Sequence, residues 1–75
     1  MFTVVGKVRK TGDFNGIAYD NVHLHCTREP QHSGEIGTIT EVIKVKTDLG
    51  NVYNVGDVID VYYDKFGKVC KIASV

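Results

Sequence analysis

The segment His23-Leu24-His25-Cys26 holds the side chains of this chain that are best suited to bind a metal ion. Residues two apart on a β-strand point to the same face, so the two imidazoles could share a metal. Cys26 would point to the opposite face, and the chain has no CxxC pair and no second pair of ligands. A histidine metal site therefore stays a minor alternative. We expect a solvated or phosphate-contacting histidine pair, with no metal and no cofactor.

Catalytic patterns are not recognisable in the sequence. Ser33 and Ser74 stand outside any nucleophile motif, and the glycines form no phosphate-binding loop. Two cysteines are too few for a disulfide framework, so we expect Cys26 and Cys70 to be buried thiols. These observations predict a protein that is not an enzyme.

The elements that must position these residues read as strands, because Val, Ile, Thr and Tyr dominate every periodic segment and no helical period is present. The expected strands cover roughly residues 2–10, 17–26, 38–47, 58–63 and 68–74. Turns are expected at 11–16, 48–51 and 64–67, with positive φ at Asn15-Gly16, and an exposed loop at 27–37. Five short strands predict a single all-β domain over residues 1–75, a small OB-like barrel, with an SH3-like barrel as the alternative.

Alternation along the strands predicts which side chains enter the core. Val22, Leu24 and Cys26 share one face of the second strand, and Ile39, Ile43 and Val45 share one face of the third, where Glu41 would mark a bulge or the strand end. In the first strand Phe2, Val4 and Val8 would point inward, while Thr3, Val5, Lys7 and Arg9 would point outward.

The opposite faces of the first three strands then carry a basic surface with an aromatic ring. Its members are Lys7, Arg9, Tyr19, His23, Lys44 and Lys46, with His25 at the strand end. Lys and Arg neutralise phosphates, and aromatic rings stack on unpaired bases. The predicted hairpin tip Lys65-Phe66-Gly67-Lys68 adds a second aromatic ring between lysines. The alternatives are an ordinary solvated face, a Tyr19 that shields the sheet and a Phe66 that covers the core rim.

Composition limits these interpretations. Nine basic and nine acidic residues give a net charge of zero, which excludes a strongly basic protein but not a local basic face. No apolar run is long enough for a transmembrane helix, and residues 1–10 lack the core of a signal peptide, so we expect a cytoplasmic protein without a membrane partner. A 75-residue domain buries little surface, which favours a homo-oligomer such as a dimer.

With these features in place, the chain resembles small OB-fold proteins, and most closely the single-stranded DNA-binding proteins of the filamentous-phage gene V type. The segment Asn15-Gly16-Ile17-Ala18-Tyr19 is similar to that family's Gly-x-x-Tyr entry into the second strand. The resemblance implies that Tyr19 contacts a base, that Phe66 acts as an aromatic wing tip, and that the protein is a homodimer of phage or mobile-element origin. Cold-shock, initiation-factor and SH3-like barrels have similar strand patterns.

We therefore predict single-stranded nucleic-acid binding, of DNA more than RNA, without strong sequence preference. Lysine and arginine side chains would follow the phosphates, and the aromatic rings would stack, with His23 assisting. The predicted binding residues are Lys7, Arg9, Tyr19, His23, Lys44, Lys46, Phe66 and Lys68. The alternative is an oligomeric interaction or assembly module that uses the exposed apolar residues Val5, Ile17, Val42 and Val58.

Overall fold

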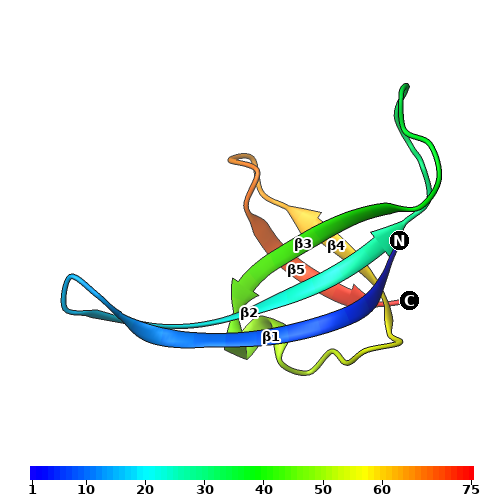
Figure 1. Ribbon diagram of the computed structural model, residues 1–75. Coiled ribbons are helices and arrows are strands. Elements are labelled where there is room, and N and C mark those ends of the chain that lie inside the picture. Colours follow the sequence, from blue (N-terminus) through cyan, green and yellow to red (C-terminus); the bar gives the residue numbers. More distant parts are fainter.

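The computed structural model describes all residues, 1–75, and contains five antiparallel strands in one sheet (Figure 1). The strands are β1 (Phe2–Phe14), β2 (Ile17–Arg28), β3 (Ile39–Lys46), β4 (Val58–Tyr63) and β5 (Val69–Ser74), in the spatial order β3-β2-β1-β4-β5. A single four-residue helix, α1 (Thr47–Gly50), follows β3. The predictions of an all-β chain and of five strands are confirmed. The structure contains no helix that could cross a membrane.

The sheet bends into two layers, with β1, β2 and β3 in front of β4 and β5 in Figure 1. β1 pairs with β4 only at Phe2 and Thr3, so β4 and β5 diverge from the other strands soon after this junction. β3 and β5 are each hydrogen-bonded to a neighbour on one side only. The sheet is therefore open between β3 and β5, and closure into a complete barrel is not observed.

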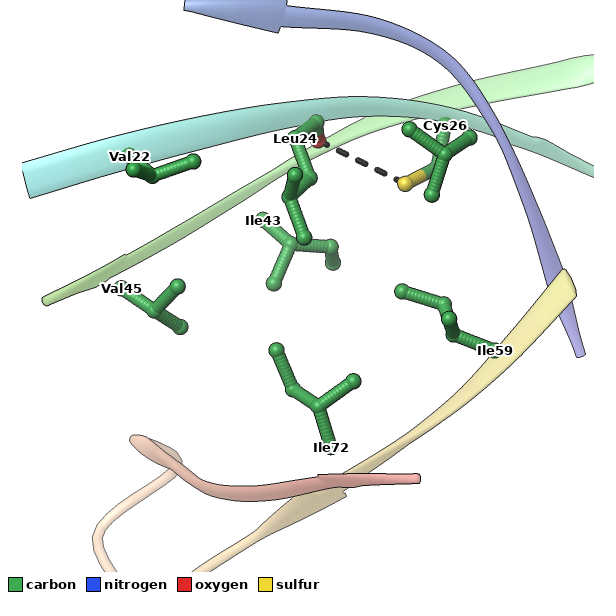
Figure 2. Close-up of a cluster of buried hydrophobic side chains, with 8 residues drawn as sticks. Val22, Leu24, Cys26, Ile43, Val45, Ile59 and Ile72 are labelled. Carbon is green, nitrogen blue, oxygen red and sulfur yellow. Dashed lines mark hydrogen bonds between the residues drawn. The ribbon is translucent and has the colours of Figure 1, made fainter. Parts of the chain in front are cut away.

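The hydrophobic core fills the space between the two layers. Val22, Leu24 and Cys26 from β2 face Ile59 and Ile72 from β4 and β5 (Figure 2). Val4, Ile43 and Val45 complete the set of buried side chains. Alternation was predicted correctly where β2 and β3 cover the core, because the two strands pair without a register shift. Val22, Leu24, Cys26, Ile43 and Val45 are buried there, and the predicted core residue Ile39 is half-buried.

The hairpin of β1 and β2 extends far beyond this core. The ladder continues to the pair Phe14 and Ile17, and the two-residue turn between them has positive φ at both Asn15 (52°) and Gly16 (79°). These are the conformations that a tight hairpin turn requires, as the Asn-Gly sequence predicted. We call residues 11–20 the arm, since all of them are exposed and the ribbon projects away from the body (Figure 1). The prediction of a turn over residues 11–16 was wrong, because strand pairing continues through Thr11–Phe14.

A β-bulge in β1 reverses the predicted faces of that strand beyond Val5, whereas Phe2 and Val4 do point toward the core as predicted. The register shifts between Val4 and Gly6, so Val5 is the extra residue. Beyond it, Lys7 lies opposite Leu24 and Arg9 lies opposite Val22, whereas Val8 lies opposite His23. Directly opposed residues share a face, so Lys7 and Arg9 belong to the core side and Val8 belongs to the outside. Val8 is accordingly exposed.

Three smaller predictions are corrected. Cys70 is exposed, not buried, because the ladder between β4 and β5 shifts register where Tyr62 opposes Lys71 and Tyr63 opposes Val69, which leaves Cys70 without an opposite residue. Residues 47–50 form a helical turn and not a simple turn, so the expectation of no helix was wrong. Glu41 interrupts the apolar face of β3 without a bulge or strand end, because its carboxylate pairs with Arg28.

Candidate nucleic-acid interface

The outer face of the sheet is the side of β1, β2 and β3 that points away from the core. Strand register arranges its residues in rows of direct neighbours across the strands. In the direction of the arm tip the rows are Gly6–His25–Val42, Val8–His23–Lys44, Lys10–Asn21–Lys46, Gly12–Tyr19 and Phe14–Ile17. Consecutive rows are about 6.6 Å apart, because they are two residues apart along strands that rise about 3.3 Å per residue.

This outer face carries basic groups and no carboxylate. The acidic residues of β1, β2 and β3 that lie within the ladders are Asp13, Asp20 and Glu41. Their opposite residues are Ala18, Thr11 and Cys26, which places all three on the core side of the sheet or on its continuation in the arm. The net charge of zero therefore conceals a segregation in which Lys10, Lys44 and Lys46 share a face without a neutralising acid.

The two arginines of the chain are engaged by carboxylates, whereas no lysine is. Arg9 forms a bidentate salt bridge with Asp20, with N–O distances of 2.9 and 2.6 Å. Arg28 pairs with Glu35 at 2.8 and 2.6 Å and also with Glu41. The cations that remain available for an external anion are therefore lysines.

An open groove continues from the outer face around the free edge of β3. Its volume is about 630 Å³. The lining residues come from the end of β3, from α1, from Asn21 of β2 and from the start of β5: Asn21, Lys44, Val45, Lys46, Asp48, Leu49, Gly67, Lys68 and Val69. Three lysines thus converge on one concavity that contains a single carboxylate, Asp48. We call this concavity the lysine groove.

Phe66 stands beside the lysine groove at the tip of the hairpin between β4 and β5. The side chain of Asp64 accepts hydrogen bonds from the backbone N–H groups of Phe66 and Lys68, at 2.8 and 3.0 Å, and so fixes the turn. Phe66 is 76% exposed, and the ammonium of Lys65 lies 5.2 Å from the centroid of its ring. Phe66 does not cover the core rim, so this alternative to a stacking role is removed.

Tyr19 lies on the outer face at the base of the arm, directly opposite Gly12. A Cβ atom on Gly12 would come within 2.7 Å of the Tyr19 hydroxyl oxygen and 2.9 Å of Cζ. The absence of a side chain at residue 12 therefore leaves the space in which the Tyr19 ring rests against β1. The side chain is still 42% exposed, which leaves part of the ring free for a ligand.

His23 occupies the centre of the outer face. Partial burial lowers its pKa, and the positive charges of Lys10, Lys44 and His25 lower it further. The imidazole is thus disposed to be neutral in the free protein. Nowhere in residues 1–75 do three or more His, Cys, Asp or Glu side chains gather in a way that could hold a metal ion.

Of the eight residues predicted from sequence, six are on or beside this continuous surface. Tyr19, His23, Lys44 and Lys46 lie on the outer face, Lys44, Lys46 and Lys68 line the lysine groove, and Phe66 is adjacent to it. Lys7 and Arg9 are not part of this surface, because the bulge at Val5 turns them to the core side of the sheet. Lys7 donates a hydrogen bond to the Asn51 carbonyl oxygen at 2.6 Å, and Arg9 is held by Asp20.

Sequence reasoning missed Lys10, which the same bulge moves onto the outer face. It also missed Asn21 as a lining residue. The one sequence signal for the bulge is Gly6, because an isolated glycine inside a strand often marks a bulge, and the predicted faces of residues 2–10 did not take it into account.

Comparison of the chain with protein-family models, with curated proteins and with solved structures found no match.

Proposed function

We propose that the protein binds single-stranded nucleic acid through the outer face and the lysine groove. The observation that supports this function is that Lys10, Lys44, Lys46 and Lys68 lie on one continuous surface, and that none of them is paired with a carboxylate. Lysines that are free of intramolecular partners can neutralise phosphates and release their counterions. The absence of carboxylates from the outer face also favours an anionic ligand, because a carboxylate in the interface would repel the phosphates.

Exposed aromatic rings favour a single strand over a duplex. Tyr19 is on the outer face and Phe66 is at the edge of the lysine groove, so the lysines lie near both rings. Base stacking on such rings needs unpaired bases, is tolerant of sequence and contributes about 1–3 kcal/mol per base. This combination supports binding with little sequence preference.

We also propose that the domain is an open OB-like barrel. Such a barrel has five strands and is partly open, and the face of its strands 2 and 3, together with the loops between strands 1 and 2 and between strands 4 and 5, binds oligonucleotides. The open five-stranded sheet of this chain supports the comparison. His23, Lys44 and Lys46 are on β2 and β3, and Phe14 and Phe66 are at those two hairpin tips. The basic surface therefore coincides with the region that this architecture uses.

A second candidate function is an oligomeric interaction module, which the apolar tip of the arm favours. Phe14 and Ile17 are direct cross-strand neighbours, and each is 72% exposed. Val5 and Val42 are also exposed. A homodimer through these side chains is compatible with nucleic-acid binding, and as the sole function it predicts an assembly that persists at high salt and ignores nucleic acid.

The test is fluorescence anisotropy of a labelled dT oligomer and of a matched duplex, titrated with the full chain at low and moderate salt. We expect tighter binding to the single strand and an affinity that falls as salt rises. Equal binding to both forms would remove the stacking rings from the interface. The absence of binding to either, with an oligomer that persists in high salt by sedimentation, would favour the interaction module.

A further inference from the structure

His23 lies among positive charges on the surface that we propose binds phosphates. On β3 its direct neighbour is Lys44, and on β1 its direct neighbour is Val8, with Lys10 one row further along. On β2 itself the neighbours on the same face are Asn21 and His25. The strands β4 and β5 lie on the other side of the core, so every charged or titratable group that faces His23 belongs to β1, β2 or β3.

The surroundings of His23 oppose its protonation in the free protein. Burial and the charges of Lys10, Lys44 and His25 all lower its pKa. No carboxylate on the outer face acts in the opposite direction, because Asp13, Asp20 and Glu41 are on the core side. No acidic side chain of the outer face therefore offsets the three positive or potentially positive groups that converge on His23.

A bound phosphate chain would reverse this balance. Its charges would offset those of Lys10 and Lys44, and a phosphate near the imidazole would favour the protonated form directly. We propose that binding of single-stranded nucleic acid is coupled to the uptake of a proton by His23, so that affinity increases as pH falls. This inference rests on the proposed function, and it assigns to that site a response to pH. Because linkage is reciprocal, a protonated His23 strengthens binding as much as binding promotes protonation.

The sign of the effect follows from the direction of the shift. A histidine whose pKa is low in the free protein and higher in the complex binds more protons in the complex. Affinity then rises as pH falls from above the complex's pKa to below that of the free protein. For each unit by which binding raises the pKa of His23, affinity increases up to about ten-fold across this pH interval.

The experiment measures the affinity for a labelled dT oligomer at about pH 8 and about pH 6, at constant ionic strength, in the range where histidine titrates. The chain is compared with His23→Gln and with the matched control His32→Gln. His32 is in the loop between β2 and β3, where its backbone N–H donates to Glu35, and it is not on the outer face. We expect several-fold tighter binding at the lower pH for the native chain and for His32→Gln, and a much smaller change for His23→Gln.

Calorimetric titration of the native chain in two buffers with different ionisation enthalpies supplies an independent readout, because proton uptake makes the observed heat depend on the buffer. Binding that is independent of pH and of buffer would overturn the proton coupling while leaving the proposed function intact. A full pH response in a folded His23→Gln variant would overturn the assignment to His23. No binding at any pH would overturn the proposed function itself, and this inference with it.

Discussion

The Tyr19 side chain occupies the space that a side chain on Gly12 would need. The two residues are direct neighbours across β1 and β2, and a Cβ on Gly12 would lie 2.7 Å from the Tyr19 hydroxyl oxygen. A glycine in a strand interior usually weakens the strand, but it also permits a close approach of another group. Here the approaching group is the aromatic ring that we propose stacks on a base, so Gly12 sets the position of that ring.

The first prediction concerns Gly12→Ala. The added methyl group clashes only with the far end of the Tyr19 side chain, and the backbone at Gly12 does not have positive φ, so the ring can move aside without unfolding the hairpin. We expect a change of less than about 1 kcal/mol in the free energy of unfolding, because alanine also reduces the entropy of the unfolded chain. Affinity for a dT oligomer should nevertheless fall, as measured by anisotropy.

The comparison for this variant is Tyr19→Ala, which removes the ring and should cost about 1–3 kcal/mol of binding. If Gly12→Ala binds like the native chain while Tyr19→Ala is weakened, the resting place of the ring over β1 has no role in binding. If neither variant is weakened, Tyr19 only shields the sheet.

The second prediction concerns Phe66→Ala. The residue is 76% exposed and is not part of the core, so thermal stability should change little. Loss of one stacked base should weaken dT binding by about 1–3 kcal/mol. The control is Tyr62→Leu, because Tyr62 is on the outside of the hairpin between β4 and β5, opposite Lys71, and is absent from the lysine groove. A larger loss for Tyr62→Leu than for Phe66→Ala would contradict this interface.

The third prediction concerns acid stability at the base of the arm. Hydrogen bonds from Arg9 and from Thr47, together with the charge of Arg9, lower the pKa of Asp20 from 3.8 to about 2. A carboxyl group with a lowered pKa in the folded state stabilises that state above its unfolded pKa, and this contribution is lost as pH falls through the folded value. The native chain should therefore melt at a higher temperature than Asp20→Asn at neutral pH.

The difference in melting temperature between the two proteins should narrow as pH falls from 3.8 toward about 2. In this interval Asp20 is already protonated in the unfolded chain but still ionised in the folded chain. Both groups of the pair are exposed, so the effect should be small. A difference that stays constant through this interval would show that Asp20 does not act through its charge.

Much of the fold could be predicted from the sequence because β2 and β3 pair without a register shift, so that alternation identifies their core faces. Val22, Leu24 and Cys26 were placed correctly in the core, and Asn15-Gly16 was placed correctly in a turn of positive φ. The length of β1 was underestimated, because Thr11-Gly12-Asp13 has turn-like composition. Pairing with β2 overrides this composition, since each residue from Thr11 to Phe14 has an opposite residue on the second strand.

The candidate site was predictable only where no irregularity occurs. One extra residue in a strand moves every later side chain to the other face, so the bulge at Val5 exchanged Lys7 and Arg9 for Val8 and Lys10 on the outer face. The lysine groove depends on how the start of β5 approaches the end of β3, which is a long-range relationship that local patterns do not encode. The partners of Arg9 were likewise invisible, because Asp20 is placed beside it by register.

The central claim is that unpaired lysines of the outer face and the lysine groove contact the phosphates of a single strand. The most direct test compares the salt dependence of dT binding for Lys44→Gln/Lys46→Gln with that for Lys7→Gln/Lys71→Gln. Both double variants lose the same charge, but Lys7 and Lys71 are outside the proposed interface.

We predict that the first variant binds more weakly and that the slope of log affinity against log salt becomes shallower by about 1.4, because each phosphate contact to a single strand contributes about 0.7. The second variant should keep nearly the slope of the native chain. Equal slopes for the two variants would contradict the claim, because binding would then depend on total charge and not on this surface.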